Sequence, residues 1–481
     1  LIPGTGPPPH HRHHHHAEGR PMTSHPFMSR RSLIAAGAIG AIGLGSGLAA
    51  LAQGQPAAKA ARGLPPIDPG RLAPMSEIVG FGGRKEANSL TADSDDVRMY
   101  REAVGWMKAR SEANPLDPMG WAQHWAHHSM FCATNTFGYQ VHYGWFFLPW
   151  HRAYLVNLEQ KIRRLLNEPA FALPYWDWTR NPRLPDWLWG ADNPLWDTTR
   201  AQEQGDMVPA DFLELGPALR ALTFDHFGGR KRVPGENQVE GTLEQGAHNN
   251  VHNWTGGEMA SFDGAGNDPL FQCHHGNIDR VWEIWLAQGE GRANPADPDW
   301  LDHRFWFFGP GGDREAVRVG DLLDTRSLGY AFADLEWRST LTSKAIPTFD
   351  GKGTTFGTID LGKTDLARIR DLTEGRARGR VSLNYERMSL PIQPFQHRLF
   401  LIDDASGAAT YVGTFTILPI PDLRSGLERS VTTQVEVPPA GLAALLEAGR
   451  VRVVGVPVPL KGRKIPEQPV PFAGVSLTVE A

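Results

Sequence analysis

Nine histidines in the middle of the chain fall into two groups, and this clustering constrains the fold more than any other feature. His248 and His252 are four residues apart, so a helix would place both imidazoles on one face. A third imidazole from a facing helix would complete a three-nitrogen metal site, and imidazole suits copper, zinc, iron or nickel. The two groups are His124, His127, His128, His142 and His151, then His248, His252, His274 and His275.

The first group also fits a helical frame. A helix is predicted to begin at Pro149, and His151 lies one turn before Leu155 on its apolar stripe. His142 lies in the approach to that helix, and His128 lies in a helix predicted over residues 117–132. Two sets of three histidines on a helical bundle predict a paired-metal site.

The pattern of the chain changes after about residue 340. Residues 95–290 are predicted to be mainly helical, whereas the later segments alternate in polarity or are β-branched. We therefore predict a multidomain protein: a mainly α-helical bundle domain over 67–338 that holds the metals, a linker over 339–379 and a C-terminal β-sandwich over 380–481. The predicted strands are 380–386, 397–402, 410–418, 431–437, 450–458 and 475–479.

Composition excludes several classes of protein. The net charge of -5 lacks the basic excess of a nucleic-acid binder, so no nucleic-acid partner is expected. Two cysteines are too few for a disulfide-rich scaffold or a four-cysteine zinc module. The hydrophobic fraction of 41% is enough for a large core.

The first 66 residues are expected to include an export signal and to lie outside the folded domains. Residues 1–28 carry a histidine run and are predicted to be a tag-like or non-native extension. Residues 29–52 combine Arg30-Arg31 with a weakly apolar stretch and resemble a twin-arginine signal peptide, with the translocon as partner; a permanent anchor is the alternative. Residues 53–66 are predicted to be a linker. We expect a periplasmic or extracellular protein without a stable membrane anchor after cleavage.

Several sequence blocks resemble one family. The chain is similar to type 3 copper proteins, specifically plant-like polyphenol oxidases (catechol oxidase and tyrosinase), here expected from a bacterium. The β region then resembles the family's shielding domain. The blocks are residues 117–132, 140–142, 147–152, 173–178, 248–254, 268–280, 299–301 and 328–332.

The resemblance implies a set of metal ligands and a cross-link. It implies two copper ions, with O2 as co-substrate, held by His128, His142, His151, His248, His252 and His275. It also implies a thioether between Cys132 and His142. An alternative register would use His124 in place of His128. Cys273 is expected to be a small buried hydrophobe.

Other positions match the family's residues around the coppers. Glu244 and Asn249 match a pair that holds a water molecule, the expected base for monophenols. Phe262 matches a gate residue and is expected above the second copper, and Phe271 is expected among the ligand rings. Asp279 is expected to fix the ligand helices. Arg152 and Arg280 are expected to form structural ion pairs.

The resemblance implies an enzyme that uses O2 to oxidise small phenols. O-diphenols would become o-quinones, and monophenols would also be hydroxylated at the ortho position. Alternatives are a catechol oxidase without monophenolase activity, a non-catalytic hemocyanin-like O2 binder and a zinc hydrolase. A zinc hydrolase would normally require a positioned carboxylate base.

Overall fold

The computed structural model describes residues 67–132, 141–419, 430–467 and 470–480. The predicted tag-like extension, twin-arginine segment and linker fall in residues 1–66 and lie outside the described residues. All of the described residues belong to one compact unit. Within the described ranges, no helix combines the length and the apolar character that a bilayer span requires.

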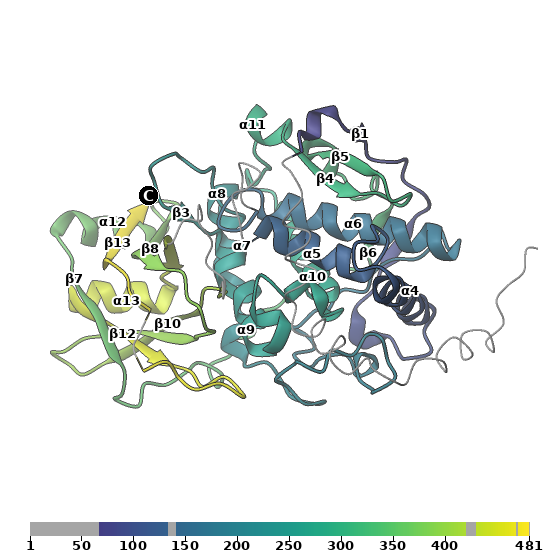
Figure 1. Ribbon diagram of the computed structural model, residues 1–481. Coiled ribbons are helices and arrows are strands. Elements are labelled where there is room, and N and C mark those ends of the chain that lie inside the picture. The colour runs from purple at the N-terminus through teal and green to yellow at the C-terminus, as the bar shows by residue number, and fades with distance from the viewer. Residues whose placement is uncertain (1–66, 133–140, 420–429, 468–469, 481) are drawn as a thin grey trace, which may run out of the picture. The chain divides into compact units, whose positions relative to one another are not determined.

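Five helices build the part of the chain that carries the histidines. Helix α6 packs against α10 and α4, and α4 also packs against α5 (Figure 1). The predicted helices over 117–132 and from Pro149 onward correspond to α5 and α6, and α4 lies within the region predicted to be mainly helical. The five are α4 (Asp95–Ala113), α5 (Trp121–Cys132), α6 (Phe147–Leu166), α9 (Asn249–Thr255) and α10 (Leu270–Ala287).

Local sequence explains where these helices begin and end. The backbone N–H of Ala122 in the first turn of α5 donates to Ser111 Oγ at 2.8 Å, which satisfies a donor that has no partner inside the helix. Helix α6 ends at Asn167, which adopts a left-handed conformation with φ of 54° and donates its N–H to Arg163 O. Asparagine tolerates this conformation better than most residues.

Short elements connect the main helices. They include a three-stranded sheet in the order β1-β5-β4 and a parallel pair of β2 and β6. Their bounds are η1 (Pro69–Arg71), β1 (Ala73–Pro74), β2 (Gly82–Arg84), η2 (Ala87–Ser89), η3 (Asp186–Leu188), η4 (Ala210–Phe212), α7 (Gly216–Arg220), α8 (Phe224–Phe227), η5 (Glu244–His248), η6 (Gly257–Ala260), η7 (Ala265–Asn267), α11 (Pro298–Leu301), β4 (Arg304–Phe308), β5 (Arg314–Arg318), η8 (Val319–Leu322) and β6 (Tyr330–Phe332).

The C-terminal region contains two four-stranded sheets, with strand orders β10-β9-β12-β7 and β13-β8-β11-β3. Six of these strands lie where the sequence predicts them. Helices α12 and α13 pack against one another beside the sheets. The elements are β3 (Gln238–Val239), β7 (Thr354–Asp360), α12 (Lys363–Thr373), β8 (Arg380–Ser389), β9 (His397–Ile402), β10 (Ala409–Phe415), β11 (Ser430–Glu436), α13 (Pro439–Ala448), β12 (Arg450–Pro457) and β13 (Gly474–Glu480).

The segment expected to be a linker, residues 339–379, is in part a regular structure. It contains β7, an edge strand paired with β12, and the helix α12. Most residues of β7 are exposed or half-buried, so the strand lacks the apolar alternation that identifies a buried strand in a sequence. The two regions also share a sheet, because β3 from the histidine-bearing part pairs in parallel with β11.

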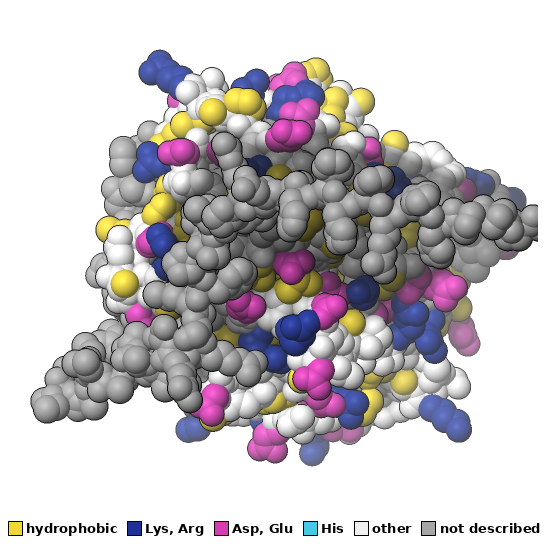
Figure 2. Space-filling view, turned by 90° about the vertical axis from the view of Figure 1, so that its right-hand side faces the viewer, with side chains coloured by type: hydrophobic (Ala, Val, Ile, Leu, Met, Phe, Trp, Pro, Cys, Tyr) yellow, Lys and Arg dark blue, Asp and Glu magenta, His cyan; other side chains and the backbone are white. Residues whose placement is uncertain are grey.

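Charged side chains stabilise the interior beneath the histidines. The Asp279 carboxylate accepts from Arg152 Nε at 2.6 Å, from Arg84 Nη1 at 2.9 Å and from the Tyr330 hydroxyl at 2.6 Å. These contacts join α6, α10, β2 and β6, as expected for Asp279 and Arg152. Arg280 pairs with Asp334 at 2.7 Å. On the face in Figure 2, by contrast, acidic and basic side chains are interspersed.

Candidate metal centre

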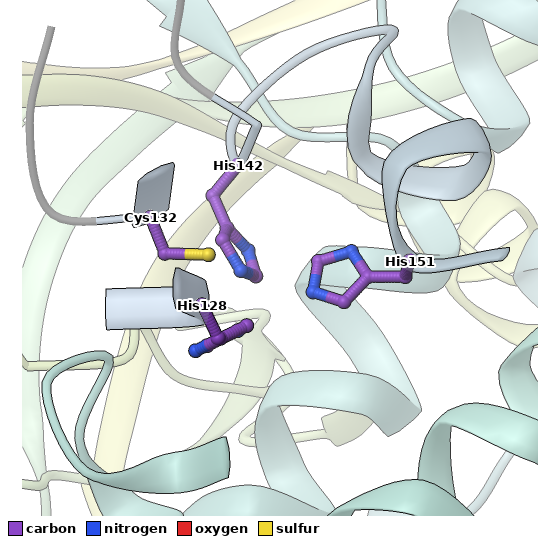
Figure 3. Close-up of side chains that lie close together, drawn as sticks. All are labelled: His128, Cys132, His142 and His151. Carbon is purple, nitrogen blue, oxygen red and sulfur yellow. The ribbon is translucent and has the colours of Figure 1, made fainter. Parts of the chain in front are cut away.

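The structure brings together four side chains from three separate parts of the chain, and these four are called the first group from here on. They are His128 and Cys132 on α5, His142 in the turn before α6, and His151 on α6. One possible ligand atom of each lies within 4.8 Å of the others, and all four side chains are buried. Figure 3 shows the three rings and the thiol approaching a common space.

Each of two rings in this group is oriented by a hydrogen bond at Nδ1. His151 Nδ1 lies 2.7 Å from the Phe147 carbonyl one turn earlier in α6. His142 Nδ1 lies 2.7 Å from Glu244 Oε1. The next residue, Tyr143, has a left-handed φ of 62° and donates its N–H to both Glu244 oxygens at 3.1 Å. Glu244 therefore holds the sharp turn that presents His142.

The second group comes from three elements: His248 ends η5 directly before α9, His252 lies on α9, and His274 and His275 lie on α10. His248, His252, His274 and His275 are all buried, and their possible ligand atoms lie within 4.8 Å of one another. His252 Nδ1 lies 2.7 Å from the Met259 carbonyl, and His248 Nδ1 lies 2.8 Å from Asn249 Oδ1. The Nε2 atoms of His252 and His275 are 3.3 Å apart.

The two groups face one another. The rings of His151 and His275 are stacked, with centroids 4.2 Å apart and planes at 10°. The centroids of His142 and His248 are 5.6 Å apart. Ring pairs this close place the two groups directly beside one another.

Electrostatics favours neutral imidazoles in both groups. Burial lowers the pKa of each of these histidines below its ordinary value, and to about 4 for His252. The Nε2 atoms of His142, His151 and His248 are buried without a hydrogen-bond partner. An unpartnered buried polar atom costs roughly 1–3 kcal/mol. Neutral nitrogens with a free lone pair are the donors that copper and zinc take, so the residues fit a bound metal.

Comparison with known proteins agrees with this geometry. The family described as the common central domain of tyrosinase matches residues 118–227 and 217–288, and the polyphenol oxidase middle domain matches residues 294–342. Residues 118–342 are therefore similar to the tyrosinase and plant polyphenol oxidase family. Proteins of this family bind two copper ions, and the two buried histidine groups fit such a pair.

Curated relatives come from plants. The chain is 32% identical over 292 residues to polyphenol oxidase B, chloroplastic, of Solanum lycopersicum, covering 51% of this chain and 49% of that protein. It is 32% identical over 312 residues to catechol oxidase B, chloroplastic, of Solanum tuberosum, covering 56% and 51%. The chain thus spans about half the length of the curated relatives it matches.

Solved structures share the fold. A latent apple tyrosinase superposes with a TM-score of 0.65 at 23% identity, covering 85% of this chain and all of the other. A functional unit of octopus hemocyanin superposes with a TM-score of 0.55 at 19% identity, covering 83% and 99%. The fold is therefore common to polyphenol oxidases and to a hemocyanin.

The alternative register of the first ligand is not supported. His124 lies outside the group: its ring stacks on Tyr154 with centroids 4.2 Å apart, and its Nε2 lies 3.3 Å from Gln272 Nε2. His127 Nε2 lies 2.8 Å from the Trp306 carbonyl. Among the three histidines of α5, the structure brings only His128 into the first group.

Both cysteines are buried and free. Figure 3 shows Cys132 Sγ pointing toward the His142 ring, the geometry that a thioether would need. Burial raises the pKa of both thiols, so they are protonated near neutral pH and are poor metal ligands in that form. The thioether itself stays a prediction.

The aromatic residues lie close to the rings, but not all as expected. Phe271 stacks on His275 at 4.1 Å and meets the edge of His128 at 4.7 Å, as predicted. Phe262 was expected above the second copper, and this expectation was wrong. Its ring lies 4.3 Å from His142 in the first group. Its loop precedes α10 and turns toward α5, a path that sequence matching does not reveal.

Three residues at the site, one in contact with a ring and two in contact with Asn249, were not predicted from the sequence. The Trp178 indole N–H donates to His274 Nδ1 at 3.2 Å. Glu240 Oε1 accepts from Asn249 Nδ2 at 2.9 Å, and the Thr416 carbonyl accepts from the same nitrogen at 3.4 Å. Trp178 lies in a block that resembles the family, but nothing in the sequence connects Glu240 or Thr416 to the site.

Proposed function

We propose that this chain is a dicopper polyphenol oxidase that uses O2 to oxidise o-diphenols to o-quinones. The observation that carries the proposal is the pair of facing groups of buried, neutral imidazoles. The names of the relatives support phenols as the substrate class. The chain spans about half the length of these relatives, so their activity is proposed for this chain and is not simply carried over from them.

We assign the first copper to His128, His142 and His151. For the second copper we assign His248, His252 and His275. His274 is excluded because Trp178 donates to its Nδ1, so the neutral ring carries its proton on Nε2 and has no lone pair there for a metal. The short distance between the Nε2 atoms of His252 and His275, 3.3 Å, suits two ligands of one ion.

Two copper ions in this site would exchange two electrons with O2, and an o-diphenol gives up two electrons on becoming an o-quinone. The chain's own contribution is orientation and exclusion of water. Backbone carbonyls and Glu244 fix the rings at Nδ1, so that Nε2 points inward. Phe271 and Phe262 pack on the rings and limit how a phenol can approach.

We propose that Glu244 and Asn249 also serve monophenol hydroxylation. Each contacts one ring, Glu244 in the first group and Asn249 in the second. Both side chains are fully buried, and Asn249 also contacts the Thr416 carbonyl of the C-terminal region. A water held by the pair would lie close to a phenol and could accept its proton.

The C-terminal region is proposed to shield the centre. Its Thr416 side chain accepts from Asn253 Nδ2 at 2.7 Å on α9, the helix that carries His252. The Pro419 carbonyl accepts from the backbone N–H of Phe262 at 3.5 Å. Deleting the chain after about residue 340 should therefore raise activity on bulky phenols.

Export by the twin-arginine route, with cleavage after about residue 52, is proposed from the sequence alone. The matched plant relatives are named as chloroplastic. N-terminal sequencing of the mature protein from a periplasmic or culture fraction tests the proposal, and a mature protein that retains residues 29–52 would contradict it.

Oxygen uptake by the copper-loaded protein tests the function directly. With catechol we expect continuous uptake and quinone formation, with about two catechols consumed per O2 because O2 takes four electrons on reduction to water. Tyrosine in a parallel reaction tests hydroxylation. A hemocyanin-like carrier would bind O2 reversibly without turnover, and a zinc hydrolase would show zinc rather than copper on metal analysis.

A further inference from the structure

Glu240 lies outside both histidine groups, yet a chain of hydrogen bonds connects it to one of them. Its side chain is buried, with 4% of the residue exposed. Glu240 Oε1 accepts from Asn249 Nδ2 at 2.9 Å, and Asn249 Oδ1 lies 2.8 Å from His248 Nδ1. The carboxyl group thus reaches an imidazole of the second group through one amide.

The contacts of Asn249 allow only one orientation of its amide. With Nδ2 toward Glu240 and the Thr416 carbonyl, both contacts join a donor to an acceptor. The flipped amide would place Oδ1 against the Thr416 carbonyl, which has no proton to donate. The oxygen of Asn249 therefore faces His248.

We infer that Glu240 is a positioning residue that fixes the tautomer of His248 through the Asn249 amide. An oxygen at 2.8 Å requires the proton of the neutral ring to lie on Nδ1. The Nε2 lone pair is then directed inward, toward His252 and His275. This inference rests on the proposed function, because the tautomer matters only if Nε2 binds a metal.

In each histidine group, one glutamate side chain orients an imidazole ring. Glu244 contacts His142 directly in the first group, whereas Glu240 acts on His248 through an amide in the second. Ligand histidines commonly donate their second N–H to such partners. The second group differs because Thr416, from the C-terminal region, also holds the amide.

Four variants of the full-length protein test the inference. Glu240→Leu removes the acceptor, and loss of such an outer partner should weaken copper binding at one of the two positions by roughly 10–100-fold. Glu240→Gln keeps an oxygen acceptor and should bind copper like the wild type. Asn249→Asp sets two carboxyl groups face to face and should resemble Glu240→Leu. Combining Asn249→Asp with Glu240→Gln restores a donor–acceptor pair and should recover most of the affinity.

The readouts are copper affinity by chelator competition and the 15N chemical shifts of His248 in the metal-free protein. The leucine variant should show a shifted tautomer equilibrium. Glu258→Gln is the matched control, since burial also raises the pKa of Glu258 to about 8, as it does for Glu240, and Glu258 contacts Asn267 instead of Asn249. This control should leave both readouts unchanged.

Two results would overturn the inference. One is wild-type copper affinity together with an unchanged His248 tautomer in Glu240→Leu. The other is a double variant no better than Asn249→Asp alone, and this comparison remains decisive if the leucine variant does not fold. If wild-type protein binds two coppers but does not turn over catechol, the proposed function fails while both readouts still report on Glu240.

Discussion

The two histidine groups are built in different ways. The second draws on a pair of helices, with His248 and His252 one turn apart and His275 on the facing α10. The first needs α5, α6 and a turn between them, and that turn is held by a left-handed Tyr143 bonded to Glu244. Helix geometry suffices to assemble the second group, whereas the first depends on a loop and on a carboxylate from a distant part of the chain.

The groups also differ in how many histidines they contain. The second has one imidazole more than a metal needs, and it contacts the C-terminal region through Asn249 and Thr416. The first has no spare imidazole but has a thiol, Cys132. Substitutions that disturb the first group should therefore act on the turn or on the Cys132 thiol. Substitutions in the second group should instead change which imidazoles bind the metal.

The largest expected effect is the difference in copper content between alanine variants of His275 and His274. His275→Ala should lower the copper content from two ions to one per chain and abolish catechol oxidation, because it removes an inward-facing lone pair. His274→Ala should keep both ions, since its Nδ1 accepts from Trp178. Copper per chain by mass spectrometry is the measurement. Loss of copper in His274→Ala alone would reverse the assignment.

The next effect concerns the turn of the first group. Glu244→Ala should weaken copper binding at the first group by roughly 10–100-fold. It should also destabilise the fold, because the buried N–H of Tyr143 loses its acceptors. Chelator competition and thermal unfolding measure the two losses. Equal weakening at both copper positions would contradict a role confined to the first group.

Substitution of Asn249 should affect monophenol hydroxylation and catechol oxidation to different extents. At saturating copper, we expect Asn249→Gly to depress monophenol hydroxylation more than catechol oxidation, because only the monophenol needs a held water as base. Asn250→Gly carries the same cost of a glycine in α9, but its amide bonds Phe212 O and Thr414 O instead of a histidine. The ratio of initial rates on tyrosine and catechol is the readout. Equal losses would contradict the proton relay.

A smaller effect concerns the thiol of the first group. If Cys132 and His142 are joined, the intact mass should fall by two hydrogen atoms and the Cys132 thiol should not react under denaturing conditions. Cys132→Ser should restore the mass expected from its sequence and leave the second group unaffected. A full complement of two reactive thiols in copper-exposed protein would exclude the thioether.

The smallest effect is the pH dependence of the metal-free protein. Burial lowers the pKa of His252 from 6.5 to about 4, so the unfolded chain binds protons in this window that the folded chain does not. Stability should therefore fall as the pH drops from 6.5 toward 4. Burial raises the pKa of Glu240 and Glu258 from 4.5 to about 8, so their contribution to stability is lost progressively as the pH rises from 4.5 to 8. Below pH 6.5 the seven buried histidines of the two groups, whose pKa burial lowers, outnumber these two carboxyl groups. Thermal unfolding should show a maximum near pH 6.5; a steady rise to pH 8 would contradict this.

The difference between the groups also explains what the sequence could reveal. The spacing of His248 and His252 and the apolar stripe beside His151 follow helix periodicity, so both are predictable from the chain alone. The six C-terminal strands alternate in polarity and were predicted as well. Their edge strand β7 was missed, because its residues are largely exposed on both faces.

Contacts between distant segments could not be predicted from the sequence. The bond from Glu244 to His142 joins residues 102 apart, and that from Asn249 to Thr416 joins residues 167 apart. Phe262 lies beside a ligand ring but was assigned to the wrong group, since its position depends on how a loop packs. Local periodicity carries no information about such tertiary contacts.

A crystal of the copper-loaded protein, measured on both sides of the copper absorption edge, tests the central claim most directly. We predict two anomalous peaks roughly 3.5–4 Å apart, as in paired-metal sites, one between His128, His142 and His151 and the other between His248, His252 and His275. A single peak, or copper bound away from these six rings, would contradict the account.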